Sequence, residues 1–455
     1  MVGAGQPVPC VDGIDRGYVD LDAAASTGAM ASVQARVEAF LPWYASVHRG
    51  AGYKSRIATA AYEDARVAAM RFAGRDPDGE DVAIFCRNTT EAINHLAYRL
   101  RLSPDDTVVT TVVEHHANLL PWARVARRRW VDCDADGTFE VAAVAAALDA
   151  APGARLLAIT GASNVTGWLP PIAEMIDAAH QRGVPVAVDA AQLAPHRPLP
   201  AAADYIAWSG HKMYAPYGSG VLIGPRATFA DGDPFLAGGG AVDLVDLDEV
   251  IWTDPPEREE AGSPNVVGAV AMHAAIDALT EAGWPAISAH EQALAQRLRA
   301  GLAAIDGVRV LGPAAGSQHD TLAVAAFTVA GAHHALVAAR LSAEHAIGVR
   351  HGCFCAHPYL IRLLGLSEAE VHEYRDGVLR GDRRSIPGAV RASCGLGTTE
   401  ADVDRLLGAV AAIAAGGDLP VGYVQDRLTG DYWPEGSSAG WSEPDRAIGA
   451  FCARS

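Results

Sequence analysis

Residues 184–224 have the sequence VPVAVDAAQLAPHRPLPAAADYIAWSGHKMYAPYGSGVLIG, in which two short apolar runs each end at polar residues. The first run, Val184 to Val188, predicts a buried strand that ends at Asp189. The second, Tyr205 to Trp208, predicts a strand followed by Ser-Gly-His-Lys, which ends at Lys212. Open α/β sheets bind ligands outside the carboxyl ends of their strands. We therefore expect Asp189 and Lys212 to face one crevice.

This pairing of an acid with a lysine has a chemical meaning. A lysine amine can form a Schiff base with an aldehyde cofactor such as pyridoxal 5′-phosphate (PLP), and an acid keeps the ring nitrogen of that cofactor protonated. We expect Ser209 and His211 to donate to the phosphate and Gln192 to reach the ring hydroxyl. In the alternative, Asp189 caps a turn and Lys212 is a solvated surface lysine. The apolar, glycine-rich surroundings of Lys212, in a chain poor in lysine, favour the cofactor.

Strands and helices alternate upstream of this stretch. Strands are predicted over Asp81–Cys86, Thr107–Val113 and Arg155–Thr160, and a helix over 172–182. Alternation from about residue 81 to 224 is the βαβ signature of a mainly parallel sheet. A chain of 455 residues, 50% of them hydrophobic, is long enough for a large α/β domain and a smaller one.

Residues 87–91, Arg-Asn-Thr-Thr-Glu, follow the first of these strands and predict an anion site. Free N–H groups, hydroxyls and the dipole of the following helix converge at such a turn. We assign Thr89 and Thr90 to the phosphate of PLP. In the alternative, Thr89 or Thr90 caps the helix, and both interpretations can hold because they use the same turn.

Residues 189–192, Asp-Ala-Ala-Gln, and residues 209–220, Ser-Gly-His-Lys-Met-Tyr-Ala-Pro-Tyr-Gly-Ser-Gly, resemble the class V aminotransferase family of fold-type I PLP enzymes. Within that family, the sequence is most similar to the group II cysteine desulfurases and selenocysteine lyases. The resemblance extends over roughly residues 18–415. Further segments similar to the family are Tyr18–Ser26, Arg87–Ala92, Ser46–Gly50, Gly161–Gly167, Phe235–Gly240 and Glu260–Asn265.

The resemblance implies an α/β, fold-type I PLP-dependent transferase with a large, mainly parallel domain and a smaller α+β C-terminal domain. We expect an N-terminal lead over 1–17 and a large PLP-binding domain over 18–283, whose N-terminal segment contributes to the site. A small domain is expected over 284–418. The tail, 419–455, is expected to be irregular and either packed on the body through its aromatic residues or disordered. Those aromatic residues are Tyr432, Trp433 and Trp441.

Several residue roles are implied by the resemblance. His115 is implied to stack on the pyridine ring as a catalytic residue, and Asn164 to contact the cofactor or the substrate carboxylate. The alternatives are a surface histidine pair and a turn-forming asparagine. His48 is expected to face the substrate, with a local hydrogen bond as the alternative. Ser263 is implied to reach the phosphate bound to a neighbouring subunit, which implies a homodimer.

Residues 350–358, Arg-His-Gly-Cys-Phe-Cys-Ala-His-Pro, are similar to the group II motif in which Cys-Ala-X-Pro follows an arginine. Carried over, the reactive cysteine is Cys355. Its thiolate would attack the sulfur of a cysteine substrate held on PLP, leave a persulfide on the protein and release alanine. Thiolate nucleophilicity needs nearby positive charge, for which Arg350 and His357 are candidates.

Other interpretations of this motif stay open. Cys353 and Cys355 could ligate a metal with His351 and His357, but no second Cys-X-X-Cys accompanies them, and we expect no metal. A disulfide between two cysteines separated by one residue would close a strained ring. Both thiols could also serve only in packing, which is common for free cysteine.

Arg391, in the run Val-Arg-Ala-Ser, matches the family arginine that binds the substrate carboxylate, which a guanidinium can hold by two parallel hydrogen bonds. A surface salt bridge is the alternative. Arg350 is a second substrate-binding candidate. The segment Tyr359–Pro387 is longer than we expect for group II enzymes and should reshape the entrance. Its charged run, Arg375–Arg384, predicts a solvated loop.

Composition limits the class of protein. The net charge of −18 argues against nucleic acid or an anionic membrane as a partner. No apolar run approaches the roughly 20 residues of a membrane span, and the first residues lack the features of a signal peptide. Seven scattered cysteines fit reduced thiols, so we expect a cytoplasmic protein.

Together these observations predict a PLP-dependent cysteine desulfurase of sulfur metabolism, acting on cysteine or a related amino acid and passing sulfur to an acceptor protein. The first alternative is a PLP-dependent C–S lyase for an S-substituted cysteine, and the second is a class V aminotransferase. A non-catalytic protein with this fold is the alternative from another class. Intact Lys212, Asp189 and Arg391 argue against it.

Overall fold

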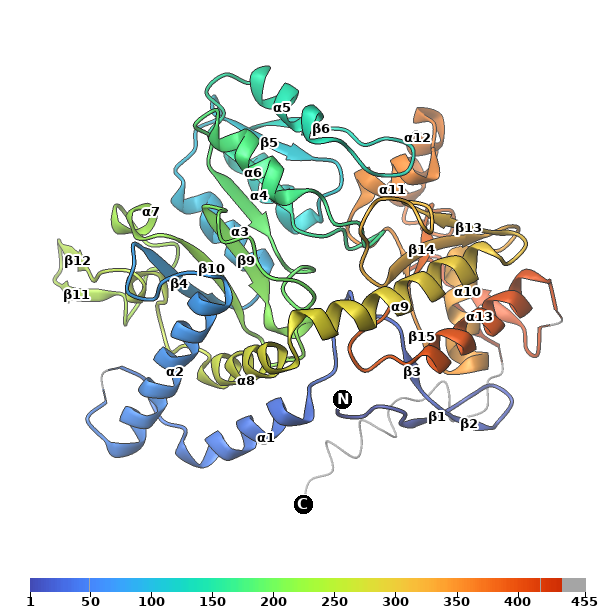
Figure 1. Ribbon diagram of the computed structural model, residues 1–455, viewed down its shortest axis with the longest axis horizontal. Helices are drawn as coiled ribbons and strands as arrows, with labels where there is room; N and C mark the ends of the chain where they lie inside the picture. Colours follow the sequence, from blue (N-terminus) through green and yellow to red (C-terminus); the bar gives the residue numbers. More distant parts are fainter. Residues whose placement is uncertain (49, 418, 436–455) are drawn as a thin grey trace.

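A seven-stranded sheet forms the larger part of the computed structural model, which describes residues 1–48, 50–417 and 419–435 (Figure 1). The strand order is β4-β10-β9-β8-β7-β5-β6. Only β10 runs opposite to its neighbours, so the predicted mainly parallel sheet is confirmed. Its strands are β4 (Asp81–Cys86), β5 (Thr107–Thr111), β6 (Arg127–Val131), β7 (Leu156–Thr160), β8 (Val186–Asp189), β9 (Tyr205–Ser209) and β10 (Gly220–Pro225).

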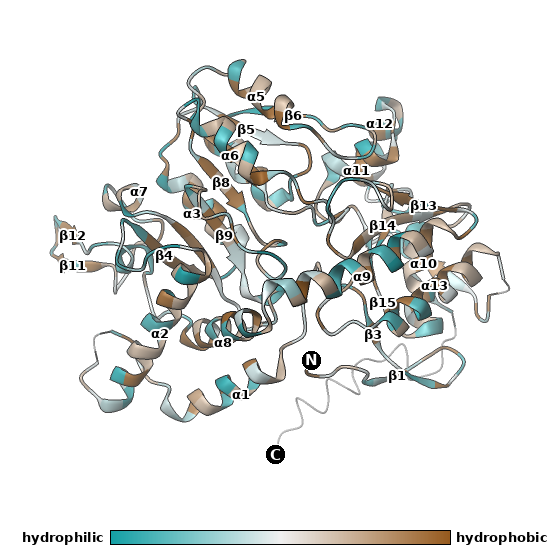
Figure 2. Ribbon diagram, viewed as in Figure 1, coloured by the Kyte–Doolittle hydropathy of each residue, from teal (hydrophilic) through white to brown (hydrophobic). Residues whose placement is uncertain are grey.

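Both faces of this sheet are buried. In β8, Val186 and Val188 enter one hydrophobic core, whereas Ala187 between them enters another on the opposite face. A strand covered on both faces is hydrophobic at consecutive positions, as in the brown strands of Figure 2. The first helices of the chain are α1 (Ala31–Phe40), α2 (Tyr53–Phe72), α3 (Thr89–Arg99), α4 (Leu120–Val125), α5 (Val141–Asp149), α6 (Ile172–His180) and α7 (Arg226–Ala230).

A smaller antiparallel sheet of order β13-β14-β17-β16 follows in the C-terminal part. The predicted strand over 347–350 is instead two short strands. The elements here are β13 (Val308–Leu311), β14 (Val324–Val329), β15 (Ile347–Gly348), β16 (Arg350–Gly352), β17 (Ala389–Ser393), α10 (His334–His345) and α13 (Glu400–Ala414). This α+β arrangement agrees with the predicted smaller domain. The predicted domain boundaries themselves stay predictions.

Helices α8 (Val266–Ala282) and α9 (Trp284–Ala303) join the two sheets (Figure 1). They meet at Gly283, which has a φ of 77° that favours glycine, and the helices bend by 84° there. Of the helices in the described part of the chain, none alone has the length and apolar character to cross a membrane, although this bent pair meets those criteria together.

The N-terminal segment lies beside the C-terminal sheet. Within the predicted N-terminal lead, β1 (Pro7–Pro9) and β2 (Asp15–Gly17) form a hairpin. Next, β3 (Val19–Asp20) pairs with β15 in parallel. Leu21 is fully buried in the C-terminal core, and the backbone of Asp22 forms an isolated parallel β-bridge with Ser393 of β17. The chain therefore passes beside the small sheet before it enters α1.

The inserted segment and residues 419–435 of the tail contain more regular structure than predicted. The insertion folds into α11 (His357–Leu364) and α12 (Glu368–Leu379), so a loop is wrong for residues 375–379. A hairpin of β18 (Tyr423–Gln425) and β19 (Tyr432–Pro434) covers it. The Arg383 amide donates to the Arg427 carbonyl at 2.9 Å, and the Tyr432 ring lies 5.6 Å from that of His333. Trp441 lies outside the described residues.

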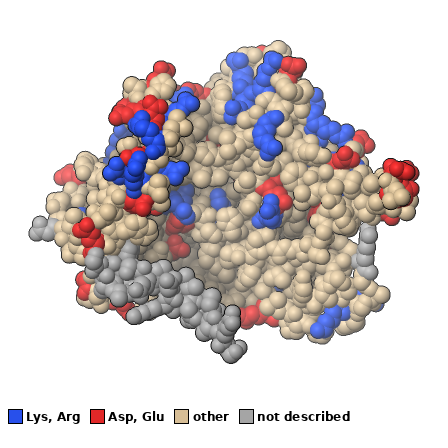
Figure 3. Space-filling view, turned by 180° about the vertical axis from the view of Figure 1, so that it is seen from behind, with Lys and Arg blue, Asp and Glu red and all other residues tan. Residues whose placement is uncertain are grey.

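Charged residues of both signs are interspersed at the edges of the face in Figure 3. Uncharged residues predominate near the hollowed centre of that face. The negative net charge of the chain therefore does not form one continuous acidic surface there.

Candidate active site

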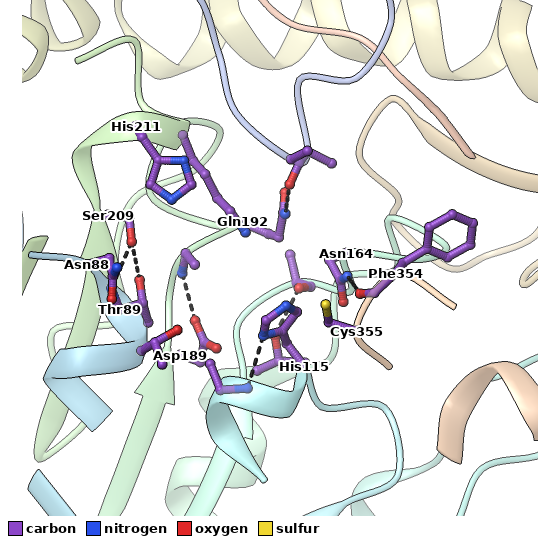
Figure 4. A pocket seen from close by; sticks show the side chains of 18 of the residues that line it. Asn88, Thr89, His115, Asn164, Asp189, Gln192, Ser209, His211, Phe354 and Cys355 are labelled. Carbon is purple, nitrogen blue, oxygen red and sulfur yellow. Dashed lines mark hydrogen bonds between the residues drawn. The ribbon is translucent and has the colours of Figure 1, made fainter. Parts of the chain in front are cut away.

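A cavity of about 320 Å³ opens beside the carboxyl ends of β5, β7, β8 and β9. Twelve of the residues predicted to form a site line it. Figure 4 shows Asn88, Thr89, Ser209 and His211 on one side and Asn164, Phe354 and Cys355 on the other. The predicted residues in its wall are Thr89, Thr90, His115, Asn164, Asp189, Gln192, Ser209, His211, Lys212, Arg350, Cys355 and Arg391.

Lys212 and Asp189 face this cavity from neighbouring parallel strands. Asp189 ends β8, and Lys212 ends the short helix η3 (Gly210–Lys212) that follows β9. Burial lowers the pKa of the Lys212 amine to about 8, against the opposing influence of Asp189. Burial also raises the pKa of Asp189. An amine whose pKa is lowered toward 7 is more often uncharged at neutral pH, and the uncharged amine is a nucleophile. Lys212 is therefore suited to form a covalent bond with an aldehyde.

The first turn of α3 forms a polar cradle with Ser209. The Thr89 amide donates to Ser209 Oγ at 2.8 Å, and the two hydroxyls lie 2.7 Å apart. The helix cap is Asn88, whose side chain accepts from the Glu91 amide at 3.0 Å, so capping by Thr89 or Thr90 is wrong. The two threonine hydroxyls therefore do not cap α3, and the dipole of α3 favours an anion at this turn.

His115 stands where β5 passes into the short helix η2 (His116–Asn118). Its Nδ1 accepts from the Ala117 amide at 3.0 Å, so in the neutral ring Nε2 carries the proton. Burial lowers the pKa of His115 to about 3, with a further contribution from Lys212. Burial likewise lowers the pKa of His211 to about 4. Both imidazoles are therefore neutral near pH 7.

Gln192 and Asn164 are fixed by backbone carbonyls. Gln192 Nε2 donates to the Ala24 carbonyl at 2.6 Å, and Asn164 Nδ2 donates to the Phe354 carbonyl at 2.7 Å. Each bond ties the large sheet to a segment distant in sequence. The cavity wall is therefore closed by the N-terminal segment and by the loop before Cys355.

Arg391 projects from β17 and is 3% exposed. Its Nη1 donates to the Asn164 carbonyl and its Nη2 to Asp22 Oδ1, both at 2.9 Å. Arg350, opposite Arg391 in the strand register, donates to the other oxygen of Asp22 through Nε at 3.0 Å. The guanidinium carbon of Arg391 lies 5.2 Å from the ring centre of Phe354. Two arginines thus meet at one carboxylate beside the cavity.

Cys355 lies on a tight loop between β16 and α11. Cys355 and Phe354 both have a φ of 54°, in the left-handed region. The Cys355 carbonyl accepts from the His116 amide at 2.7 Å, which fixes the loop against η2. The residue is exposed, and Lys212 and Arg391 both interact with its thiol electrostatically. Strained backbone of this kind is often found at functional sites.

His357 does not supply charge to Cys355 in this arrangement. Its ring stacks on that of His116 with the ring centres 5.0 Å apart, and His357 Nδ1 lies 3.2 Å from His116 Nε2. Burial lowers the pKa of both rings, which favours their neutral forms. Arg350, which lines the cavity with Cys355, is the better-placed cation.

The geometry does not support the metal or the disulfide alternative for the cysteine motif, whereas Cys353 packs against the main hydrophobic core, as the packing alternative expects. Nε2 of His351 lies 3.2 Å from an oxygen of Asp431, whereas Cys353 enters a separate small cavity with Tyr374. Within residues 1–48, 50–417 and 419–435, no group of three or more His, Cys, Asp or Glu side chains is arranged to hold a metal ion. Cys353 and Cys355 are both free thiols.

Two predicted residues lie outside the cavity. His48 Nε2 is 2.9 Å from Glu63 Oε1, which matches the alternative of a local hydrogen bond. Ser263 is exposed on the segment before α8 and does not line the cavity of its own chain.

Asp22 and Glu114 were not predicted, although Asp22 lies in the segment Tyr18–Ser26 and Glu114 directly follows the predicted strand Thr107–Val113. Glu114 is fully buried and accepts from Thr111 Oγ1, Asn118 Nδ2 and the Thr160 amide at 2.7–3.0 Å. Burial raises its pKa to about 8. An acid at the end of an apolar strand was the available signal for Glu114, as it was for Asp189.

Comparisons with known proteins agree with this geometry. The family model described as "Aminotransferase class-V" matches residues 19–406. A cysteine desulfurase of Dickeya dadantii is 34% identical, over 87% of this chain and 92% of the relative. A probable cysteine desulfurase of Halobacterium salinarum is also 34% identical, over 88% of this chain and 91% of the relative.

Solved structures give the same result. The apo structure of a cysteine desulfurase from Thermococcus onnurineus has a TM-score of 0.77 and 31% identity, covering 88% of this chain and 95% of that one. The cysteine desulfurase CsdA of Escherichia coli has a TM-score of 0.74 and 32% identity, with the same coverage. The predicted fold class is therefore confirmed.

Proposed function

We propose that this chain, which belongs to the class V aminotransferase family of PLP-dependent enzymes, is a cysteine desulfurase that leaves sulfur as a persulfide on Cys355. One observation carries the proposal: Lys212, Asp189, Arg391 and Cys355 line a single cavity. A lysine and an acid suit the cofactor, an arginine suits a carboxylate and a thiol suits sulfur transfer. The relatives named as cysteine desulfurases support the same activity.

The residues of the cavity fit PLP. The first turn of α3 with Thr89, Thr90, Ser209 and His211 would hold the phosphate, because it offers hydroxyl and amide donors at the N-terminus of a helix. Lys212 would bind the aldehyde carbon covalently. When bound, PLP supplies an electron-accepting ring that stabilises negative charge on the substrate.

Three residues would surround the ring. Asp189 would accept from the ring nitrogen through the carboxylate oxygen that the Ala191 amide leaves free, and a positive ring nitrogen would favour its ionised form. Neutral His115 would stack on the ring, and Gln192 would reach its hydroxyl.

The remaining residues would act on the substrate. Arg391 would hold the carboxylate, with Asn164 and Arg350 beside it. The substrate amine would displace Lys212 from the aldehyde carbon, and the freed Lys212 amine would take the proton from Cα. The Cys355 thiolate would attack the substrate sulfur, so that an S–S bond forms and the Cβ–S bond breaks. The electron pair of the broken bond stays with Cβ, which gains a proton. Alanine leaves, and the persulfide remains.

We further propose a homodimer in which Ser263 of one copy reaches the phosphate held by the other. Ser263 is exposed and lies outside its own cavity. The nearby hairpin of β11 (Val242–Val245) and β12 (Val250–Trp252) exposes Leu244, Val245, Leu247 and Ile251. An apolar surface of this kind is typical of a protein interface. Light scattering on the PLP-loaded chain tests the expected dimer mass.

Two further proposals concern the surroundings of the enzyme. The exposed position of Cys355 would let an acceptor protein remove the sulfur. A cytoplasmic location is supported by the six cysteines of the described residues, all of which are free thiols.

Incubation of the PLP-loaded chain with free cysteine tests the reaction. We expect alanine in an amount equal to the sulfur recovered as sulfide or protein persulfide. Pyruvate and ammonia would instead indicate elimination by a C–S lyase, and exchange with a keto acid would indicate an aminotransferase. Either result without alanine would overturn the proposal.

A further inference from the structure

The turn that presents Cys355 has a backbone conformation that its own residues do not favour. It is closed by a bond from the Ala356 amide to the Cys353 carbonyl at 2.9 Å. Its two central residues, Phe354 and Cys355, both have a φ of 54°. Positive φ at both central positions is typical of turns built from glycine or asparagine. Contacts from outside the turn must therefore hold it in this shape.

Two residues of the larger sheet region supply such contacts. Asn164 Nδ2 donates to the Phe354 carbonyl at 2.7 Å. The backbone amide of His116 donates to the Cys355 carbonyl at 2.7 Å, and its ring Nε2 accepts from the His357 amide at 3.3 Å. His116 thus forms a clamp that binds residue 355 through its main chain and residue 357 through its side chain.

The ring of His116 also takes the place of a helix cap. His357 is the first residue of α11, and the first amides of a helix have no acceptor within it. The capping position is Ala356, whose side chain has no oxygen to accept a bond. Because Pro358 has no amide hydrogen, the His357 amide is the first donor of the helix that needs an acceptor. His116 Nε2 is that acceptor.

This bond requires a neutral imidazole, because only an unprotonated Nε2 can accept. Burial lowers the pKa of His116, and the neighbouring His357 acts in the same direction. The rings of the two histidines stack with their centres 5.0 Å apart, which keeps the pair together. The His116 clamp is therefore closed near pH 7.

The clamp also relates the thiol to the cofactor. His115, the residue before His116, lines the cavity, and under the proposed function it stacks on the ring of PLP. Consecutive residues of one short segment thus contact the cofactor and the turn that carries Cys355. His116 itself does not line the cavity, so it acts on the reacting atoms only through its neighbours.

We propose that His116 is a positioning residue for sulfur transfer, which fixes the Cys355 thiol in relation to the cofactor ring by holding the Cys355 carbonyl and the His357 amide. This inference rests on the proposed function for the step that it serves, the attack of the thiolate on the substrate sulfur. Cofactor binding and the displacement of Lys212 by the substrate amine do not need the clamp. Its loss should therefore slow only the transfer of sulfur.

Three substitutions of His116 separate its acceptor from the rest of the ring. His116→Gln keeps an acceptor at a reach similar to that of Nε2, whereas the same amide in His116→Asn is too short by one methylene. His116→Leu fills a similar volume without an acceptor. His180→Leu is the matched control, because it removes an imidazole from a surface pair with Asp204 at 2.9 Å.

Two measurements apply to each PLP-loaded variant. Hydrogen exchange followed by mass spectrometry reports the opening of residues 353–360, and a single turnover with free cysteine gives the rate of persulfide formation on Cys355. In His116→Leu and His116→Asn, we expect these amides to exchange about tenfold faster and the persulfide to form about tenfold more slowly. The visible absorbance of the bound cofactor, and its change on addition of cysteine, should match the parent. His116→Gln and His180→Leu should match the parent in both measurements.

Unchanged exchange or unchanged persulfide formation in His116→Leu would overturn the proposal, as would a His116→Gln protein as slow as His116→Leu. Loss of the cofactor absorbance in His116→Leu would show that the residue supports the cofactor instead, which would also overturn it. If His116→Leu does not fold, His116→Asn decides in its place. Hydrogen exchange needs no substrate, so it tests the clamp even in a chain that forms no alanine from cysteine, a result that would overturn only the proposed function.

Discussion

The two sides of the cavity are built differently. On the cofactor side, Asp189 and Ser209 end strands of one sheet and Thr89 and Lys212 follow strands of it, and each lies within a short sequence motif. On the other side, Asp22 follows β3, whereas Arg350 and Arg391 come from β16 and β17, more than 300 residues later in the chain. The cofactor side is thus local in sequence, whereas the other side depends on contacts between distant segments.

The largest effect is expected on the cofactor side, from Lys212→Ala. Without the amine, the cofactor is not bound covalently and no group takes the Cα proton. We expect loss of visible absorbance from bound cofactor and a drop of about 10³-fold in alanine formation. The chain has only one other lysine, so Lys54→Ala is a clean control that should keep both properties. A coloured Lys212→Ala protein would contradict the assignment.

Cys355→Ser tests the substrate side alone. We expect it to bind PLP normally but to form no persulfide, with alanine release reduced by about 10²-fold. Mass spectrometry after a single turnover measures the persulfide. Cys353→Ser, two residues away and in a separate cavity, should retain both properties. Full alanine release by Cys355→Ser would show that another group accepts the sulfur.

The pH dependence of cofactor loading tests whether burial lowers the pKa of the Lys212 amine. With a pKa of about 8, the Lys212 amine is protonated at lower pH and cannot attack an aldehyde. The rate at which the apo chain gains visible absorbance after addition of PLP should therefore rise with pH and level off above about pH 8. A plateau reached only near pH 10, as for an ordinary lysine, would show that burial does not activate the amine.

The smallest effect is expected at Asn88, the cap of α3. Removing its side-chain bond to the Glu91 amide in Asn88→Ala should lower the free energy of unfolding by about 1 kcal/mol. Asn88→Gly should cost only a few tenths of a kcal/mol. Chemical denaturation of the apo chain measures both. Equal losses would indicate that Asn88 does not act as a cap.

The residues on the cofactor side could be predicted from the sequence more completely than those on the other side, because they depend on local patterns. Strand ends are local, so the positions of Thr89, Asp189 and Lys212 followed from apolar runs and the polar residues after them. Asp22 lies in a segment already noted, but its partners lie more than 300 residues away, and no local pattern reports such a pairing.

One local signal in the insertion was overlooked. Residues 375–379 have the charge of a solvated loop, yet they complete α12, which begins with a capping box of Ser367 and Glu370. His48 could not be placed from its motif, because its contact with Glu63 depends on how the loop folds back on α2. Capping by Asn88 was overlooked because the neighbouring threonines are also good caps.

The tail hairpin β18–β19 has a consequence for any shortened version of the protein. The family match ends at residue 406, but Asp431 lies 3.2 Å from His351, the neighbour of Arg350. Arg383 and Arg384 of the insertion are also bound to the hairpin through its backbone and Gln425. Trimming the polypeptide at the family limit would thus remove the outer contacts of the strand that carries Arg350, so the folded unit around the cavity extends beyond the family match.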